Sequence, residues 1–235
     1  MNAMVLAAGL GTRLLPITTS LPKALVPVAG TPLLGIILHR LKAHGFTHVA
    51  VNAHHHAKQV KHFLQHFAEQ NDVTLYLSQE PVLLDTGGGI RKMLDFFDKD
   101  APILVHNVDV LTTLHYAHLM RAHIDSRAAA TLVINRRQTD RPLSFSSQGD
   151  FLGRLTNFQE NEVLFGFCGI QVIQPFLFRR IDADRFYSID AYEKAAQAGF
   201  LIRGYDITTC YWRDVGTPGD LQAAEKDIQQ ERFTL

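Results

Sequence analysis

Apolar strand-like runs alternate with stretches of helical periodicity along the first 135 residues of this 235-residue chain. The run at residues 4–8 predicts a buried strand, and residues 32–44 carry apolar side chains at helical spacing. Further strands are predicted at residues 48–52, 73–77, 103–107 and 129–134, and further helices at residues 57–69, 90–97 and 114–124. This alternation, with strands that are almost entirely apolar, is typical of a mostly parallel sheet with helices on both faces. The sequence therefore predicts an α/β fold with a Rossmann-like central sheet.

The pattern changes after about residue 136. Two short apolar runs, at residues 143–145 and 151–155, flank a turn that contains glycine, as in a hairpin. Strands are also predicted at residues 165–173, 201–205 and 211–215, and helices at residues 190–197 and 218–230. We expect these elements to form a smaller, mixed and partly antiparallel lobe. Because no long linker separates the two parts, we expect a single domain over residues 1–235.

Composition argues against several classes of protein. The 23 Lys and Arg residues balance 23 Asp and Glu residues, and a net charge of zero argues against a general nucleic-acid surface. The longest apolar stretches are far short of a membrane span, so we expect no membrane partner. The chain enters an apparent strand directly at Ala3, so we expect no signal peptide. Cys168 and Cys210 lie in apolar strand-like segments, where we expect buried free thiols of a cytoplasmic protein.

A loop with two glycines, Gly9 and Gly11, follows the first predicted strand. Glycines let backbone N–H groups approach a phosphate closely. Arg13 and Lys23 then add two cations. Leu14 stands where a dinucleotide-binding loop has its third glycine, and no Gly-Lys-Ser/Thr sequence is present, so neither common nucleotide loop matches. Two glycines alone would be an ordinary turn, but the loop and its cations together predict a site for a polyphosphate.

Three consecutive glycines, Gly87 to Gly89, stand at the entrance of the predicted helix at residues 90–97. Such a run is costly to order in a folded chain. It predicts a flat base or ribose lying against the backbone. The alternative is a flexible loop that enters the helix, with Asp85 or Thr86 as its N-cap.

Two aspartates stand near the ends of predicted strands. Asn107 and Asp109 follow an apolar strand, and Asp214 lies in the sequence Trp-Arg-Asp-Val-Gly-Thr-Pro before the last predicted helix. Ligands of open α/β sheets lie at the carboxyl ends of strands. Mg²⁺ prefers a few protein oxygens together with phosphate and water. Asp109 alone is also explained as a helix N-cap or turn residue, and neither aspartate has a strong case by itself. Together with the glycine loop they form a consistent site, in which the carboxylate of Asp109 suits Mg²⁺.

Residues 6–27 and the Trp-x-Asp-x-Gly-Thr-Pro sequence closely resemble the signatures of sugar-1-phosphate nucleotidylyltransferases. The Thr-Gly-Gly-Gly sequence is similar to that of the branch with N-acetylmuramate-1-phosphate uridylyltransferases and small guanylyltransferases such as those for mannose 1-phosphate. The resemblance implies that an NTP and a sugar 1-phosphate react to give an NDP-sugar and pyrophosphate with Mg²⁺. Uridine and guanosine both fit as the base, and N-acetylmuramate, mannose and heptose 1-phosphates fit as the acceptor.

The resemblance also implies roles for individual residues. Catalysis would depend on Arg13, Lys23 and Asp109, and Mg²⁺ would bind Asp109 and Asp214. The nucleotide would contact Leu6, Ala8, Gly9, Gly11, Thr12, Arg13, Glu80, Thr86, Gly87 and Gly88. The sugar would contact Asn107, Gly169 and Asp190. Residues 1–135 would be the nucleotide-binding half and residues 136–235 the sugar-binding half with a closing helix. We expect a monomer or small homo-oligomer without a C-terminal β-helix domain.

Other features have simpler explanations. Three adjacent histidines, His54 to His56, predict a loop, because adjacent side chains do not converge on one metal ion. A solvated basic edge explains Arg136, Arg137 and Arg141, although an extra anionic group on the sugar would also fit them. Many relatives hold the sugar phosphate with a Glu-Lys pair, but residues 157–162 contain no lysine, so this contact stays unassigned.

Two other functions stay open. A glycosyltransferase that uses a nucleotide sugar would also have an α/β fold and an acidic metal site, but it would release NDP and would not need both Arg13 and Lys23. A non-catalytic nucleotide-sugar sensor would bind without turnover, but it would not need to keep both Asp109 and Asp214.

Overall fold

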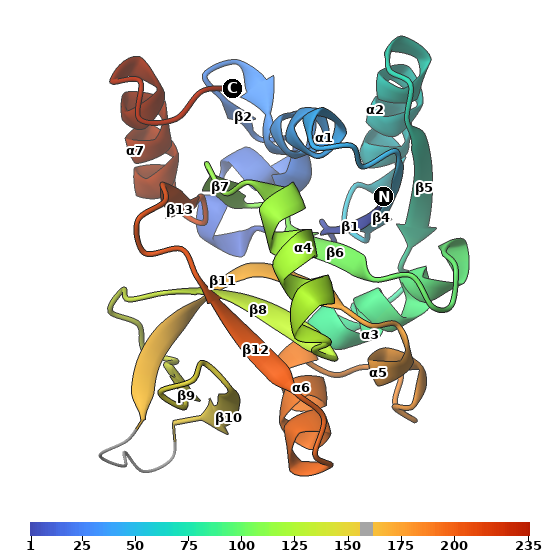
Figure 1. Cartoon of the computed structure of the whole chain (residues 1–235). Helices are drawn as coiled ribbons and strands as arrows, with labels where there is room; N and C mark the ends of the chain where they lie inside the picture. The colour runs from blue at the N-terminus through green and yellow to red at the C-terminus, as the bar shows by residue number, and fades with distance from the viewer. Residues whose placement is uncertain (156–161) are drawn as a thin grey trace. The chain divides into compact units, whose positions relative to one another are not determined.

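A computed structural model of the chain describes residues 1–155 and 162–235. These residues form two compact units, which Figure 1 labels by element. Unit 1 consists of residues 1–83, 106–114 and 211–235, and unit 2 of residues 84–105 and 115–210. Unit 1 is therefore assembled from three separate stretches of the chain. The sequence-based division of one domain at residue 135 stays a prediction.

Unit 1 is organised around parallel strands. β1 (Asn2–Leu6) pairs with β4 (His48–Ala53), which pairs in turn with β5 (Thr74–Gln79). α1 (Leu33–Ala43) and α2 (Ala57–Gln70) connect these strands, and α2 packs against β5 (Figure 1). Most side chains of β1 and β4 are fully buried, as expected for strands with both faces covered. This arrangement brings the carboxyl ends of the three strands to one edge.

Short elements complete unit 1. The chain after β1 forms the 3₁₀ turns η1 (Thr12–Leu14), η2 (Ile17–Thr19) and η3 (Lys23–Leu25) and the hairpin of β2 (Pro27–Val28) and β3 (Thr31–Pro32). β6 (Ile103–Asn107) leads into this unit, and β7 (Val110–Thr112) pairs antiparallel with β13 (Trp212–Asp214). α7 (Pro218–Gln229) follows, with Thr217 and Asp220 forming a capping box at its start.

Unit 2 contains a mixed sheet. β8 (Ala130–Asn135) lies between β11 (Val163–Ile173), which is antiparallel to it, and β12 (Ile202–Asp206), which is parallel. The hairpin of β9 (Leu143–Phe145) and β10 (Phe151–Arg154) extends the sheet through β11. The helical segments are α3 (Asp85–Met93), η4 (Leu94–Phe96), α4 (Tyr116–Ser126), α5 (Phe176–Arg179) and α6 (Ser188–Gln197). α6 packs against α3 and β10 (Figure 1).

The structure confirms the α/β, Rossmann-like fold class, with parallel strands in unit 1 and a partly antiparallel sheet in unit 2. The predicted hairpin is also confirmed. Among the described residues, none of the helices combines the length and apolar character that a membrane span requires.

Three predictions about local structure were wrong. The first strand ends at Leu6, not at residue 8, because the Ala7 N–H donates to the Asn52 side chain. The helix predicted from residue 90 begins at Asp85, so the three glycines lie inside its first turns. Cys168 is buried in β11 as expected, but Cys210 is half-buried in a bend outside any strand.

Candidate functional site

The glycine loop folds back compactly after β1. Gly11 has a φ of 66°, which favours glycine, and its carbonyl accepts hydrogen bonds from Leu14 N and Thr18 Oγ1, both at 2.8 Å. A Cβ on Gly11 would lie 2.9 Å from Thr18 Cγ2 and 3.1 Å from Lys23 Cβ. A side chain at this position would therefore push Lys23 away. Around a Cβ built on Gly9, by contrast, there is open space.

A buried hydrogen-bond chain joins the ends of the three parallel strands in unit 1. Asn52, near the end of β4, accepts from Ala7 N at 2.6 Å and donates to Glu80 Oε1 at 2.7 Å. Asn52 and Glu80 are 3% and 2% exposed. The backbone N–H of Glu80 also donates to Ala53 O. Asn52 thus fixes the start of the glycine loop relative to Glu80. Asn52 was not among the predicted site residues, because its one signal in the sequence is its place at a strand end.

Asp109 and Asp214 are brought together by the β7–β13 pair. Asp214 lies opposite Val110 in the ladder, and Val215 N donates to Asp109 O at 2.7 Å. The Oδ1 atom of Asp214 is buried and has no hydrogen-bond partner. Burial and, after it, the charge of Asp109 raise the pKa of Asp214. A carboxylate whose charge is disfavoured in this way is stabilised by cations nearby.

Two cationic side chains, Lys23 and Arg13, lie near these carboxylates. Lys23 is 9% exposed, and its ammonium group donates to Asp109 Oδ2. Arg13 lies beside Asp214, with Gly216 next to both side chains. A Cβ built on Gly216 would be 2.5 Å from Arg13 Nη2 and 2.8 Å from Asp214 Oδ1. The missing side chain of Gly216 makes room for both groups. The structure therefore brings together four of the predicted side chains, Arg13, Lys23, Asp109 and Asp214.

Other predicted residues of unit 1 lie close in sequence to Arg13 or Asp109. The Leu6 carbonyl at the end of β1 accepts from Val108 N at 3.1 Å, Ala8 is buried, and Thr12 is exposed at the start of η1. Asn107 is half-buried at the end of β6. In the described part of the chain, no group of three or more His, Cys, Asp or Glu side chains is arranged to hold a metal ion. Two carboxylates with an unsatisfied oxygen fit Mg²⁺, which takes its other ligands from phosphate and water.

In unit 2, the glycines of α3 have a close neighbour in the protein. Gly87 N and Gly88 N both donate to Phe186 O, at 2.8 and 3.3 Å. A Cβ on Gly87 would lie 2.3 Å from Phe186 Cδ2, and one on Gly88 would lie 2.2 Å from Asp184 O. Thr86 Oγ1 accepts from Ser188 N at 2.9 Å. The segment around Phe186 gives these glycines a packing role, and the nucleotide contact stays a prediction.

Both predicted sugar-binding residues of unit 2 have structural explanations. Gly169 has a φ of 73° and lies where β11 shifts its register against β8, as in a β-bulge. Asp190 is the third residue of α6, where Oδ2 accepts from Tyr187 N and Oδ1 pairs with Arg154. Arg154 also pairs with Glu193 at 2.9 Å. These partners explain the Asp190 carboxylate at the start of α6 without a ligand. The sugar contacts of Gly169 and Asp190 therefore stay predictions.

The features with simpler explanations are placed as follows. His54 Nδ1 lies 2.8 Å from Glu80 O and His56 Nε2 lies 3.1 Å from Thr19 O, so two of the three histidines hold loops of unit 1. Arg137 donates to Phe167 O and Asn135 Oδ1, whereas Arg141 is exposed. Residues 157–161, where a Glu-Lys pair was sought, lie outside the described residues.

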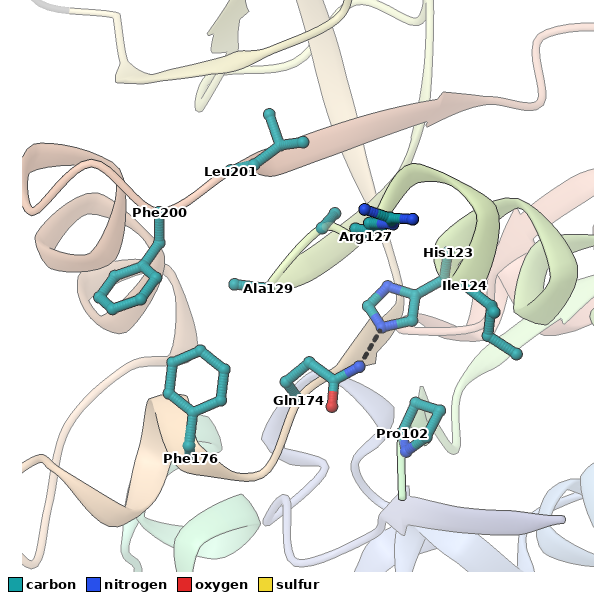
Figure 2. A pocket seen from close by; sticks show the side chains of 10 residues that line it. Pro102, His123, Ile124, Arg127, Ala129, Gln174, Phe176, Phe200 and Leu201 are labelled. Atoms are coloured by element: carbon teal, nitrogen blue, oxygen red, sulfur yellow. Dashed lines mark hydrogen bonds between the residues drawn. The ribbon is translucent and has the colours of Figure 1, made fainter. Parts of the chain in front are cut away.

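Unit 2 also has a cavity of about 560 Å³ beside the end of α4. Figure 2 shows its lining, in which the rings of Phe176 and Phe200 lie 5.3 Å apart and Gln174 reaches His123. Burial lowers the pKa of His123 to about 4, so this histidine is neutral, and it lies 2.9 Å from Thr131 Oγ1. None of the predicted site residues lines this cavity.

Comparisons with known proteins identify the family of this chain. Residues 2–160 match the family described as nucleotidyl transferase. The chain is 32% identical over 232 residues to N-acetylmuramate alpha-1-phosphate uridylyltransferase of Neisseria meningitidis serogroup B, covering 96% of this chain and 97% of that protein. It is 27% identical to a probable mannose-1-phosphate guanylyltransferase of Oryza sativa subsp. japonica, covering 94% of this chain but 62% of that protein's length.

A solved structure supports the fold. The structure of a putative glucose-1-phosphate thymidylyltransferase from Bacillus anthracis superposes with a TM-score of 0.83. The match covers 96% of this chain and 94% of that one, at 18% identity. At that identity the likeness shows a shared fold.

Proposed function

Because the chain belongs to the nucleotidyl transferase family, we propose that it converts an NTP and a sugar 1-phosphate into an NDP-sugar and pyrophosphate. The proposed nucleotide is UTP or GTP, and the proposed acceptor is a 1-phosphate of N-acetylmuramate, mannose or heptose. The relative from Neisseria matches over nearly its whole length, which favours the first of these sugars.

One observation carries the proposal. Arg13, Lys23, Asp109 and Asp214 lie together beside a glycine loop, and Asp214 Oδ1 is buried without a partner. A cluster of two cations and two carboxylates is suited to a polyphosphate and a divalent cation. A glycosyltransferase or a nucleotide-sugar sensor would not need all four side chains.

The proposed chemistry requires no general base. The sugar phosphate is largely ionised near pH 7, since its second pKa is about 6. One of its oxygens attacks the α-phosphorus of the NTP. The bond between the α-phosphorus and the oxygen that bridges it to the β-phosphorus breaks, and pyrophosphate leaves in line. The protein's contribution is positioning and charge neutralisation. Gly11, Thr12 and Arg13 would hold the β- and γ-phosphates, and Lys23 would stabilise charge around the α-phosphate.

Asp109 and Asp214 would hold Mg²⁺. When bound, the ion would neutralise and orient the phosphate oxygens of donor and acceptor. Glu80 and the backbone of Thr86, Gly87 and Gly88 would contact the base and ribose, with Leu6, Ala8 and Gly9 forming the rest of the nucleotide site. Asn107, Gly169 and Asp190 would contact the sugar. We further propose that the enzyme is cytoplasmic, a monomer or small homo-oligomer, and supplies nucleotide sugars for the cell envelope.

The test is pyrophosphate release with Mg²⁺, using UTP, GTP, CTP, ATP and dTTP against a panel of sugar 1-phosphates. We expect release with one NTP and one sugar phosphate. Lys23→Ala and Asp109→Ala should each lower turnover about 100-fold or more without unfolding the protein. Lys61→Ala and Asp125→Ala, at exposed positions on helices, should have no effect.

Other outcomes would favour the other functions. Release of NDP in place of pyrophosphate would indicate a glycosyltransferase. Tight binding of a nucleotide sugar without turnover would indicate a sensor. Near-normal turnover of either alanine variant would remove that residue from the proposed catalytic machinery.

A further inference from the structure

We infer that Lys23 is a placeholder cation: it neutralises the metal-binding carboxylates before substrates bind, and it leaves Asp109 when a divalent cation arrives. This inference rests on the proposed function, in which Asp109 and Asp214 hold the metal. It assigns Lys23 a second role beside its proposed contact with phosphate.

The geometry of Lys23 supports this role. Its side chain is 11% exposed and that of Asp109 is 17% exposed, so the ion pair is largely removed from water. Lys23 begins the 3₁₀ turn η3, and it lies so close to Gly11 that a Cβ on Gly11 would be 3.1 Å from Lys23 Cβ. A buried charge is costly without a partner. The fold therefore directs an ammonium group at one oxygen of the carboxylate pair.

The second carboxylate is left less well satisfied. Asp214 Oδ1 is buried and has no hydrogen-bond partner, although the Arg13 guanidinium lies beside it. The cluster thus keeps one buried acceptor open while Lys23 occupies an oxygen of Asp109. A divalent cation at the two carboxylates would be repelled by an ammonium group already bound there. The two cations consequently compete for Asp109.

Displacement of Lys23 has a use in the reaction. Once off Asp109, its ammonium group would be available to the phosphates of the nucleotide, which are the other strong anions at the site. The phosphates would favour the state in which the metal binds, and metal and phosphate would then bind with positive coupling. Without phosphate, the ion pair would keep metal affinity low.

The alternative is that Lys23 only orients Asp109. The two roles predict opposite results for a variant without the ammonium group. A placeholder competes with the metal, so its removal tightens metal binding. A structural partner positions the carboxylate, so its removal weakens metal binding or leaves it unchanged.

The experiment is a titration of the full chain with Mn²⁺ alone, in the absence of nucleotide, with free Mn²⁺ measured by electron paramagnetic resonance. We expect Lys23→Met to bind Mn²⁺ at least tenfold more tightly than the wild type. Arg13→Met is the matched control, because it removes one positive charge beside Asp214 without breaking an ion pair at Asp109. The affinity of Arg13→Met for Mn²⁺ should rise less than threefold over that of the wild type. Lys23→Met combined with Asp109→Asn should lose the gain, which would locate the ion at Asp109.

Equal affinity in Lys23→Met and the wild type, or an equal gain in Arg13→Met, would overturn the inference. Thermal unfolding of each variant would show that the compared proteins are folded. Pyrophosphate release by the wild type is measured separately. Release without a gain in Lys23→Met would refute only the placeholder role. A gain without release from any substrate pair would refute the proposed function and leave the competition standing.

Discussion

At the scale of single residues, a buried and a half-buried aspartate of unit 1 have opposite environments. Asp227 is 4% exposed and is fully engaged: it accepts from Arg213 Nε at 2.7 Å and from Tyr211 Oη at 2.9 Å. Asp214 has a buried oxygen with no partner, and burial followed by the charge of Asp109 raises its pKa. An unsatisfied buried acceptor of this kind is suited to an ion or a water molecule. Asp227 therefore serves the fold, whereas the open acceptor of Asp214 suits its proposed role as a metal ligand.

This difference predicts opposite effects of two identical substitutions. Asp227→Ala should lower the free energy of unfolding by about 3 kcal/mol or more, because it leaves the partly buried Arg213 without its main partner. Asp214→Ala should change the free energy of unfolding by less than about 1 kcal/mol, because the substitution removes repulsion between Asp214 and Asp109. The same substitution should abolish pyrophosphate release. Urea unfolding and the release assay measure both quantities. A loss of stability in Asp214→Ala as large as that in Asp227→Ala would show that Asp214 is structural.

At the scale of elements, the position of each end depends on where backbone N–H groups find partners. α1, α2 and α7 were predicted within two residues of their observed ends, because their periodicity and flanking residues are local signals. β1 stops early because Ala7 donates to Asn52, and α3 starts early with Gly87 and Gly88 bonded to Phe186. Those partners lie tens of residues away or further. No local pattern reveals them.

The candidate site likewise contains residues with a local sequence signal and a residue without one. The four charged residues of unit 1 belong to motifs whose residue types indicate phosphate and metal chemistry, and the structure places them together. Asn52 belongs to no motif, and its importance depends on contacts with Ala7 and Glu80 that form only in the folded chain. Sequence reasoning therefore found the charged groups and missed the residue that holds the loop.

The packing of α3 predicts how its glycines respond to substitution. Gly88→Ala would place a methyl group 2.2 Å from the Asp184 carbonyl, so the backbone must move, at a cost of about 1–3 kcal/mol. Gly219→Ala is the matched control, because Gly219 lies in α7 and its nearest neighbour would be 3.8 Å away. It should be neutral or stabilise the protein by up to about 1 kcal/mol. Thermal unfolding of both variants measures the difference, and equal effects would show that Asp184 yields easily.

At the scale of the whole molecule, the proposed roles divide between the two units. Unit 1 carries all the proposed phosphate and metal residues, although they come from three stretches of the chain that lie far apart in sequence. Unit 2 carries the Thr86 to Gly88 segment and two of the proposed sugar contacts, Gly169 and Asp190. Substitutions in unit 2 should therefore change recognition of one substrate without disturbing the phosphate and metal cluster.

Asp190 allows this division to be tested, because Glu193 shares its partner. Asp190 and Glu193 lie in the first two turns of α6, and both carboxylates pair with Arg154. If Asp190 contacts the sugar, Asp190→Asn should raise the KM for the sugar 1-phosphate about tenfold while leaving the KM for the NTP unchanged. Glu193→Gln, which weakens the same ion-pair network, should change neither constant by more than about twofold, since exposed pairs contribute little. Steady-state kinetics with each substrate varied in turn separates the two constants. If both variants raise the KM for the sugar equally, Asp190 acts through Arg154 and the capping of α6. If the KM for the NTP rises as well, Asp190 does not act on the sugar 1-phosphate alone.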